Sequence, residues 1–273
     1  MKLFHLMLAA MLSGAVFTSA FAAEAKTEKP AAKKAAKKAA KKTKRPRKPL
    51  TFEQQLARYA KPAGAVPKRH VQRIADKKAY AEKHGKDIKI IMLGDSITHQ
   101  WEYPRNKKFN ETYMAPYKVL NLGCGSDSTR NTLHIVEKTG ILELTKPALV
   151  TIMIGTNNTF GKADPRVTAA AIKRIIEGVS TRCPDAVILL HAIFPRGRDN
   201  NDPLRIVNNK VNDEIVKFCD GKKVIWFDIR KDFLTPEGVL ERTMMPDLLH
   251  PRDKQGYHVW GKALRPYFEK YGK

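Results

Sequence analysis

The stretch IKIIMLGDS, residues 88–96, is a nearly continuous apolar run that ends in a glycine and two polar residues. Four further short runs, rich in β-branched residues, also end at turn signals: KVLNLG (118–123), LVTIMIG (149–155), AVILLHAIF (186–194) and KVIWFDI (223–229). Apolar runs without alternation are typical of strands that are covered on both faces, as in a parallel sheet. The sequence therefore predicts five parallel strands.

Stretches with helical spacing separate or follow these runs, roughly at 128–140, 165–181, 203–219 and 252–271. Pro165 and Pro203 stand where the first turn of a helix tolerates proline. The segment from Thr51 to about Lys83 also has helical character, and we expect it to pack outside the first strand. Alternating strands and helices predict an α/β fold, a three-layer α/β/α sandwich around a five-stranded parallel sheet.

The first 22 residues have the pattern of a secretory signal peptide. An apolar run from Leu6 to about Phe21 follows a short basic start, and Ala20-Phe21-Ala22 fits the small-x-small pattern of a cleavage site. The run is short for a membrane span, and an uncleaved anchor is the alternative. We therefore expect an exported protein, periplasmic or secreted, whose mature chain begins near Ala23.

Residues 23–50 have an unusual composition, with twelve Lys or Arg, two Glu and no aromatic residue between 24 and 50. Such a segment cannot bury enough apolar surface to offset the loss of chain entropy, so we expect a disordered basic tail. The tail is interpreted either as a solvated linker or as a tether to an anionic envelope surface. Nucleic acid would bind the same charges but is ranked last, because an exported protein rarely meets it.

Residues 51–273 are enough for one α/β domain with a well-buried core. The chain has a formal net charge of +24, to which this part also contributes. Its three cysteines, Cys124, Cys183 and Cys219, are too few and too uneven for a disulfide framework, although a Cys183–Cys219 pair stays open. Their spacing does not suggest a zinc site, and nothing in the sequence indicates an oligomeric state.

Ligands of open parallel sheets bind beyond the carboxyl ends of the strands. Four polar segments are expected to meet at that edge: 94–96, 123–129, 155–158 and 247–250. Among them, Ser96 stands at a strand-to-helix turn, and His250 lies three residues after Asp247. A serine hydroxyl needs a base to remove its proton, and the base works best when a third group orients it. We therefore predict a triad in which Ser96 is the nucleophile, His250 the base and Asp247 the orienting acid.

An oxyanion that forms on the attacked carbonyl group needs fixed hydrogen-bond donors. The candidates are the backbone N–H of Ser96, a backbone N–H of the 123–126 loop and the side-chain amide of Asn157. A role for Asp95 in hydrogen bonding to loop backbone is favoured over one as a second catalytic acid. Trp101, beside Ser96 in sequence, is interpreted as core or pocket wall in preference to a platform on which a sugar stacks.

Taken in order, the motifs GDSIT (94–98), NLGCGSDST (121–129), GTNN (155–158) and DLLH (247–250) resemble the four conserved blocks of the SGNH (GDSL-type) hydrolase superfamily. The chain looks most similar to the catalytic subunits of platelet-activating-factor acetylhydrolase and to bacterial esterases related to them. The resemblance covers roughly residues 86–270. It implies a flavodoxin-like sandwich, hydrolysis of small acyl esters without a metal or cofactor, and Ser96, Asp247 and His250 as the triad.

One position departs from the pattern of the superfamily. The second oxyanion donor is usually the glycine just before the aspartate of the second block, and this chain has Ser126 there. A serine still offers its backbone N–H. A positive φ at this position would, however, strain a serine where it would not strain a glycine.

Two classes of function follow from these features. The first is an exported serine esterase that hydrolyses small acyl esters, most simply acetyl esters of a carbohydrate or another envelope component. A lysophospholipase or thioesterase is a variant of this class. The second is a binding or scaffold protein with weak or lost catalysis, held at the envelope by the basic tail, for which Ser126 is the only support.

Overall fold

A computed structural model of the chain describes residues 48–252 and 255–273. The predicted signal peptide, residues 1–22, and the basic tail up to residue 47 lie outside the described residues. Residues 49–273 form one unit. Within the described residues, no helix combines the length and the apolar character that crossing a membrane requires.

The central sheet has five parallel strands, as the sequence predicts: β1 (Ile90–Gly94), β2 (Val119–Asn121), β3 (Leu149–Met153), β4 (Val187–His191) and β5 (Val224–Phe227). Their order across the sheet is β2-β1-β3-β4-β5. The chain therefore moves from β1 to β2 on one side and then crosses back over β1 to β3 on its other side, so the strand order reverses at β1. The crevice at the carboxyl end of β1 is the place where such a sheet binds ligands.

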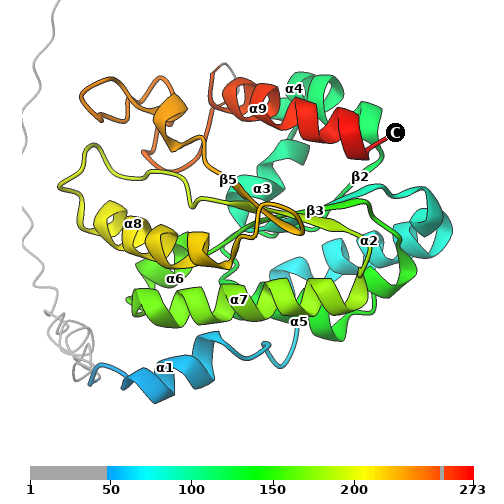
Figure 1. Cartoon of the computed structure of the whole chain (residues 1–273), viewed down its shortest axis with the longest axis horizontal. Helices are drawn as coiled ribbons and strands as arrows, with labels where there is room; N and C mark the ends of the chain where they lie inside the picture. The colour runs from blue at the N-terminus through cyan, green and yellow to red at the C-terminus, as the bar shows by residue number, and fades with distance from the viewer. Residues whose placement is uncertain (1–47, 253–254) are drawn as a thin grey trace, which may run out of the picture. The chain divides into compact units, whose positions relative to one another are not determined.

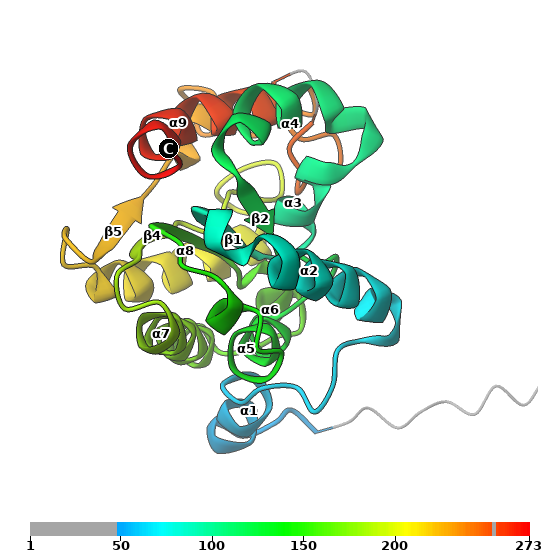
Figure 2. The ribbon, with the colours of Figure 1, turned by 90° about the vertical axis from the view of Figure 1, so that its right-hand side faces the viewer.

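Helices cover both faces of the sheet (Figures 1 and 2). One face carries α4 (Lys107–Tyr113) and α9 (Gly256–Tyr271), with the short α3 (Ser96–His99) leading toward them. The other face carries α2 (Val71–His84), α5 (Thr129–Lys138), α7 (Pro165–Arg182) and α8 (Pro203–Ile215). The short α6 (Thr156–Phe160) follows β3, and α1 (Phe52–Tyr59) lies outside this layer. The predicted three-layer α/β/α sandwich is confirmed.

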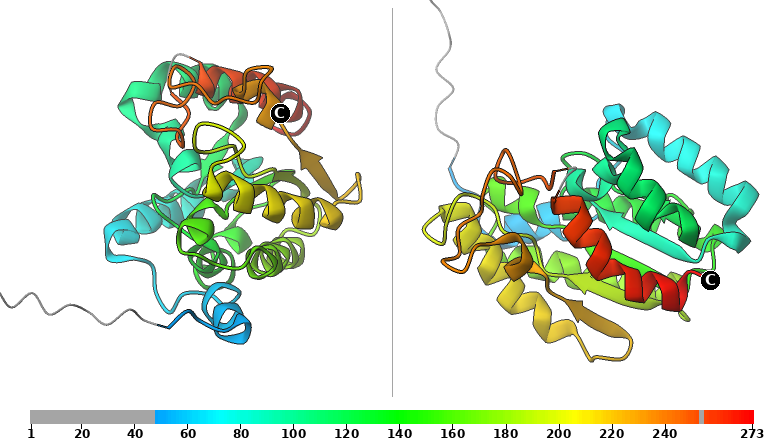
Figure 3. Two further views of the ribbon diagram at one scale, coloured as in Figure 1. Left: turned by 90° about the vertical axis from the view of Figure 1, so that its left-hand side faces the viewer. Right: turned by 90° about the horizontal axis from the view of Figure 1, so that it is seen from above.

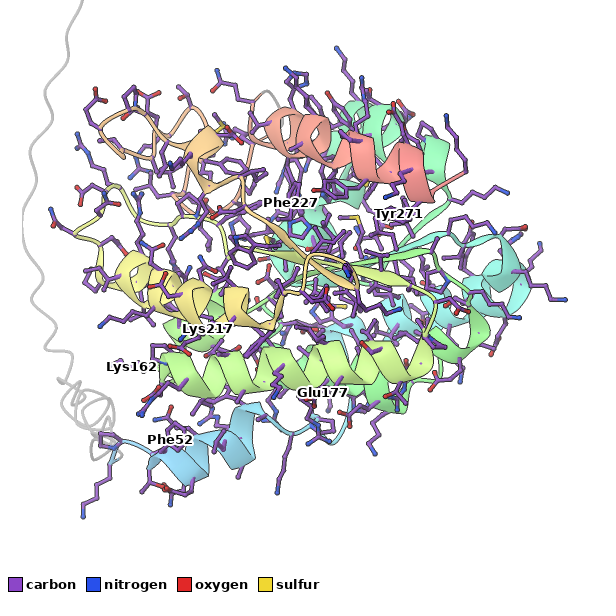
Figure 4. The ribbon with its side chains drawn as sticks, in the orientation of Figure 1. Phe52, Lys162, Glu177, Lys217, Phe227 and Tyr271 are labelled. Carbon is purple, nitrogen blue, oxygen red and sulfur yellow. The ribbon has the colours of Figure 1, made fainter. Side chains whose placement is uncertain are left out.

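The strands bury both of their faces because their side chains alternate between two apolar clusters. Ile91 and Leu93 of β1 pack with the helices of the α5 and α7 layer, whereas Ile90 and Met92 pack with α4 and α9. Figure 4 shows the side chains that fill the space between the sheet and α9, including the labelled Phe227 of β5. This two-sided burial explains why the strands read as unbroken apolar runs.

The structure corrects one prediction and settles an open one. Only the second half of the segment 51–83 lies beside the first strands, where Ile74 of α2 joins their apolar cluster. The first half, α1, packs against α7 instead, through Tyr59 and Val167. All three cysteines are free, so the Cys183–Cys219 pair that the sequence left open does not form.

Candidate active site

Ser96 occupies the position immediately after β1, where the chain turns into α3. Asp95 caps this helix, since its Oδ1 accepts a hydrogen bond of 3.0 Å from the backbone N–H of Ile97. Asp95 is 1 % exposed, and burial raises its pKa to about 6. The buried cap fixes the turn that presents the Ser96 hydroxyl, which agrees with the predicted backbone role of Asp95.

The three predicted triad side chains form one hydrogen-bonded chain. Ser96 Oγ lies 2.8 Å from His250 Nε2, and His250 Nδ1 lies 2.6 Å from Asp247 Oδ2. Because a carboxylate only accepts, the imidazole proton sits on Nδ1, and Nε2 is left to accept the serine proton. Two segments that are 154 residues apart in the sequence thus meet at the carboxyl edge of the sheet.

The turn from Asp247 to His250 is built around the carboxylate. Asp247 Oδ1 accepts from the backbone N–H groups of Leu249 at 3.1 Å and His250 at 2.8 Å. Burial alone would raise the pKa of Asp247, but the hydrogen bonds from His250 and the backbone outweigh it and lower that pKa. Leu248 has φ +57, and its carbonyl group accepts from the backbone N–H of Gly197 at 2.9 Å.

The loops after β4 and β5 lie side by side at this edge, in yellow and orange in the left panel of Figure 3. The Gly197–Leu248 bond joins them beside the triad, and a second bond runs from Leu240 N to Arg198 O at 2.7 Å. A bulky residue in the left-handed region is strained, and such strain persists only where neighbouring contacts hold it. The partner loop supplies such a contact at Leu248.

Asn157 and Asn158 are adjacent in α6 but differ in their surroundings. Both ends of the buried Asn158 amide are bonded to Thr129, with Oδ1 3.0 Å from its backbone N and Nδ2 2.7 Å from Oγ1. Asn157 is half-buried, and its Nδ2 donates to the carbonyl group of Asp127 at 2.8 Å. An amide nitrogen has two protons, so Asn157 keeps one for a ligand.

The loop between β2 and α5 carries the remaining candidate donor, Ser126. The backbone N–H of Asp127 donates to Cys124 O at 3.2 Å and closes a tight turn, in which Ser126 has φ +61. The positive φ that would strain a serine is therefore present. In the part of the chain that the structure describes, neither the backbone N–H of Ser126 nor that of Ser96 has an acceptor.

A pocket of about 550 Å³ opens beside His250 and Asp247. Its other walls come from polar or proline side chains: Gln100, Arg105, Pro246, Pro251 and Arg252. Within the described residues, no group of three or more His, Cys, Asp or Glu side chains is placed to hold a metal ion. The arrangement offers a nucleophile with a base and unpaired amide donors, and a polar cavity borders the base and its carboxylate.

A family model of the GDSL-like lipase/acylhydrolase family matches residues 92–258, which include every segment of this site. The chain belongs to the GDSL-like lipase/acylhydrolase family. It is 32 % identical over 188 residues to platelet-activating factor acetylhydrolase IB subunit alpha1 of Bos taurus, covering 67 % of this chain and 76 % of that protein. It is 34 % identical over 170 residues to subunit alpha2 of Rattus norvegicus, covering 60 % and 69 %.

Solved structures with low sequence identity share the fold of this GDSL-like protein. A GDSL-like lipase from Bacteroides thetaiotaomicron matches with a TM-score of 0.57 and 19 % identity, over 74 % of this chain and 97 % of that one. The acetyl xylan esterase AlAXEase matches with a TM-score of 0.54 and 20 % identity, over 66 % and 99 %. These similarities support the SGNH-type α/β fold.

Arg196 is a residue of this GDSL-like site that the motif reasoning did not assign. Its Nη1 donates to Thr156 Oγ1 at 3.0 Å, next to Asn157. Burial lowers the pKa of this arginine, while the charges of nearby Asp95 and Asp247 act in the opposite direction. The only signal in the sequence was its place in the PRG stretch after the fourth strand, which by itself does not show where the side chain points.

Trp101 and three histidines have structural roles. Trp101 is fully buried, its ring centroid 5.2 Å from that of Trp260, so it cannot serve as a platform for a sugar. His134 Nδ1 lies 2.6 Å from Ala63 O, and His258 Nδ1 lies 2.8 Å from the Tyr113 hydroxyl. His99 Nδ1 accepts from the backbone N–H of Gly125 at 3.3 Å, and thus touches the loop that carries Ser126.

Proposed function

We propose that this chain is an exported serine esterase that removes acetyl or other short acyl groups from a carbohydrate or another envelope ester. The observation that carries the proposal is the unbroken chain from Ser96 Oγ through His250 to Asp247, with separations of 2.8 and 2.6 Å. This arrangement activates a hydroxyl group for acyl transfer.

In the proposed reaction, Ser96 Oγ attacks the carbonyl carbon of the ester while His250 Nε2 takes the hydroxyl proton. The carbonyl oxygen becomes an oxyanion, which accepts from the backbone N–H groups of Ser96 and Ser126 and from the Asn157 amide. His250 then gives its proton to the leaving alcohol oxygen as the C–O bond breaks, and an acyl ester on Ser96 remains. Water, deprotonated by His250, attacks this ester and releases the carboxylic acid and the free serine.

The polar lining of the pocket favours a small acyl group and a hydrophilic alcohol. Gln100, Arg105 and Arg252 face a cavity whose remaining walls are two prolines, Asp247 and His250. A long alkyl chain would find no apolar wall there to offset the cost of displacing water from these groups. An acetyl group also appears in the names of both the platelet-activating factor acetylhydrolase relatives and the acetyl xylan esterase neighbour.

Hydrolysis of p-nitrophenyl acetate by the purified protein tests the proposal. We expect turnover that falls by at least about 10³-fold in Ser96→Ala and His250→Ala. Ser180→Ala on α7 and His84→Ala at the end of α2 are matched controls, and both should keep the wild-type rate. Equal turnover by the wild type and both triad variants would leave the alternative of a scaffold protein with lost catalysis.

A series of esters with acyl chains of two to twelve carbons, together with acetylated sugars, tests the substrate class. The polar pocket leads us to expect that kcat/KM falls steadily with chain length. A maximum at eight or more carbons would favour the lysophospholipase variant instead.

The basic tail is proposed to hold the enzyme at an anionic surface. Each lysine near an anionic leaflet contributes about 1 kcal/mol, so twelve cationic side chains are sufficient at moderate salt. Deletion of residues 24–47 should leave turnover of a soluble ester unchanged and abolish salt-sensitive retention on vesicles that contain phosphatidylglycerol. Unchanged retention would make the tail a linker.

A further inference from the structure

The loop after β2 directs its carbonyl groups toward one neighbouring segment. Three alternate carbonyl groups accept hydrogen bonds from side chains of residues 69–73: those of Asn121, Gly123 and Gly125. Arg73 supplies the first two bonds, with Nη2 3.0 Å from Asn121 O and Nε 2.9 Å from Gly123 O. The donors lie outside the residues 92–258 that match the family model.

The N–H groups between these carbonyl groups point the opposite way, toward β1. Leu122 N donates to Met92 O at 2.9 Å, and Cys124 N donates to Gly94 O at 3.2 Å. A further step of two residues on each segment leads from Cys124 to Ser126 and from Gly94 to Ser96. The N–H of Ser126 therefore faces the nucleophile only while its peptide keeps the orientation of the two before it.

The peptide between Gly125 and Ser126 is the central peptide of the turn that Asp127 N closes on Cys124 O. Ser126, the third residue of this turn, has φ +61, while Gly125 does not have a positive φ, which is the pattern of a type II turn. A type I turn differs mainly by a flip of this central peptide and gives its third residue a negative φ. Serine prefers the negative φ by roughly ten-fold, so the turn alone favours the flipped orientation.

His70 and Arg69 hold the carbonyl end of that peptide. His70 Nε2 lies 2.7 Å from Gly125 O, and Arg69 Nη2 lies 3.2 Å from it. A carbonyl oxygen only accepts, so the imidazole proton is on Nε2; the 3.0 Å approach of Arg69 Nε to the same nitrogen is then a contact without a hydrogen bond. His99 accepts from the N–H of Gly125 at the other side of the residue.

We infer that His70, assisted by Arg69, is a positioning residue that keeps the Gly125–Ser126 peptide in the orientation that aims the Ser126 N–H at the oxyanion. The inference rests on the proposed esterase function. It explains how a serine serves where the superfamily usually has glycine: side chains from the segment before the first strand hold the unfavourable turn. The carbonyl bonds also polarise the peptide and make its N–H a stronger donor.

The test compares His70→Ala, His70→Gln and His70→Ala combined with Ser126→Gly in the full protein, with p-nitrophenyl acetate as substrate. We expect His70→Ala to lower kcat about 10- to 100-fold with KM within about two-fold, because an oxyanion donor acts in the transition state. His70→Gln keeps an N–H donor near the same place and should retain at least a third of kcat. Adding Ser126→Gly should restore kcat about ten-fold, because glycine accepts a positive φ without penalty.

Gln72→Ala, at the start of α2 two residues after His70 and with its side chain bonded to Asp76, is the matched control and should keep wild-type kcat. Circular dichroism and thermal unfolding verify that each variant is folded. Wild-type kcat in His70→Ala, or a loss that Ser126→Gly does not relieve, would overturn the inference while Ser96-dependent turnover still supported the esterase. If the wild type were no more active than Ser96→Ala, the proposed function itself would fail.

Discussion

Two loops of this protein each hold an aspartate and a strained residue, yet they are stabilised in opposite ways. In the turn 247–250 the aspartate makes local bonds: the Asp247 side chain is 56 % exposed and accepts from residues two and three positions later, while one backbone bond from Gly197 to Leu248 ties the turn to another loop. The loop 121–127 depends on distant partners: the Asp127 side chain is 2 % exposed, and the bonds to the loop carbonyl groups come from about fifty residues earlier. Bonds between near neighbours, such as those of Asp247, can be predicted from sequence, whereas bonds from distant side chains to a loop cannot.

The two aspartates make the same contrast in their protonation. Hydrogen bonds lower the pKa of Asp247 and keep it ionised beside the imidazole. Burial raises the pKa of Asp127 to about 8, and its Oδ1 lies no closer than 3.9 Å to Arg69 Nη2 and 4.0 Å to His70 Nε2. The first carboxylate orients the proposed base, and the second is a desolvated group inside the loop. Substitutions in each loop should therefore affect different measurements.

The largest effect is expected for Asp247→Asn. The amide would present a donor to His250 Nδ1 and favour the tautomer that cannot accept the Ser96 proton, so kcat should fall roughly 10³- to 10⁴-fold. Asp232→Asn, an exposed carboxylate in the same part of the chain after β5, is the control and should keep wild-type kcat. A loss of less than ten-fold in Asp247→Asn would show that the local turn does not set the imidazole tautomer.

The next largest effect separates the two adjacent asparagines of α6. Asn157→Ala removes a proposed oxyanion donor and should lower kcat about 10²-fold with little change in the midpoint of thermal unfolding. Asn158→Ala leaves the buried backbone N–H of Thr129 without an acceptor and removes the bond to its hydroxyl group, so it should cost about 1–3 kcal/mol in the free energy of unfolding. Steady-state kinetics and urea unfolding of both variants measure these effects. A loss of kcat in Asn158→Ala together with a loss of stability in Asn157→Ala would mean that the roles of the two residues are exchanged.

A smaller effect is expected for Arg73→Ala, which removes the brace at the start of the oxyanion loop. Asn121 O and Gly123 O lose their donors, but the Gly125 peptide keeps its own, so kcat should fall only about 3- to 10-fold. Lys77→Ala is the matched control, because it removes the other partner of Glu102 without touching the loop. Equal kinetics for the two variants would indicate that the bonds of Arg73 to the loop do not matter for catalysis.

Much of this architecture could be predicted from sequence because it depends on local patterns. Two-sided burial makes the five strands visible as apolar runs, and the D-x-x-H spacing places Asp247 next to His250 within one turn. The bracing of the loop 121–127 has no such signal. Arg69, His70 and Arg73 appear in the sequence as an ordinary basic segment, and only the tertiary fold shows which carbonyl groups they contact.

Two details of the site depended on the same tertiary information. The positive φ of Ser126 was foreseen only as a condition, since the backbone of a turn is decided by what holds its peptides. The burial of Trp101 against Trp260 was likewise settled by the packing of α9, a helix about 160 residues further along the chain. Sequence proximity to Ser96 had made Trp101 the candidate for a stacking platform, and its burial excludes that role and agrees with the preferred interpretation as a core residue.

The smallest effect on kcat is expected for Asp127→Asn, which instead tests stability and its dependence on pH. Burial raises the pKa of Asp127 from the ordinary value of 3.8 to about 8, so the folded protein binds this proton more tightly than the unfolded chain does. The associated stability is complete below about pH 4 and is lost as the pH rises through 8. The asparagine variant has no such proton to lose. The difference in the free energy of unfolding should therefore appear above about pH 4, favour the asparagine variant, and widen until about pH 8 by up to about 1.4 kcal/mol per pKa unit.

Urea unfolding of both proteins at pH 5, 7 and 9 measures this difference. A gap that widens with pH would show that Asp127 is protonated in the folded state and that Arg69 and His70 are too far away to stabilise its charge. A gap that narrows or reverses would show that the carboxylate is ionised and paired with them. In that case the cationic side chains would hold the loop through Asp127 as well as through the carbonyl group of Gly125, and the two loops would differ less than their exposure indicates.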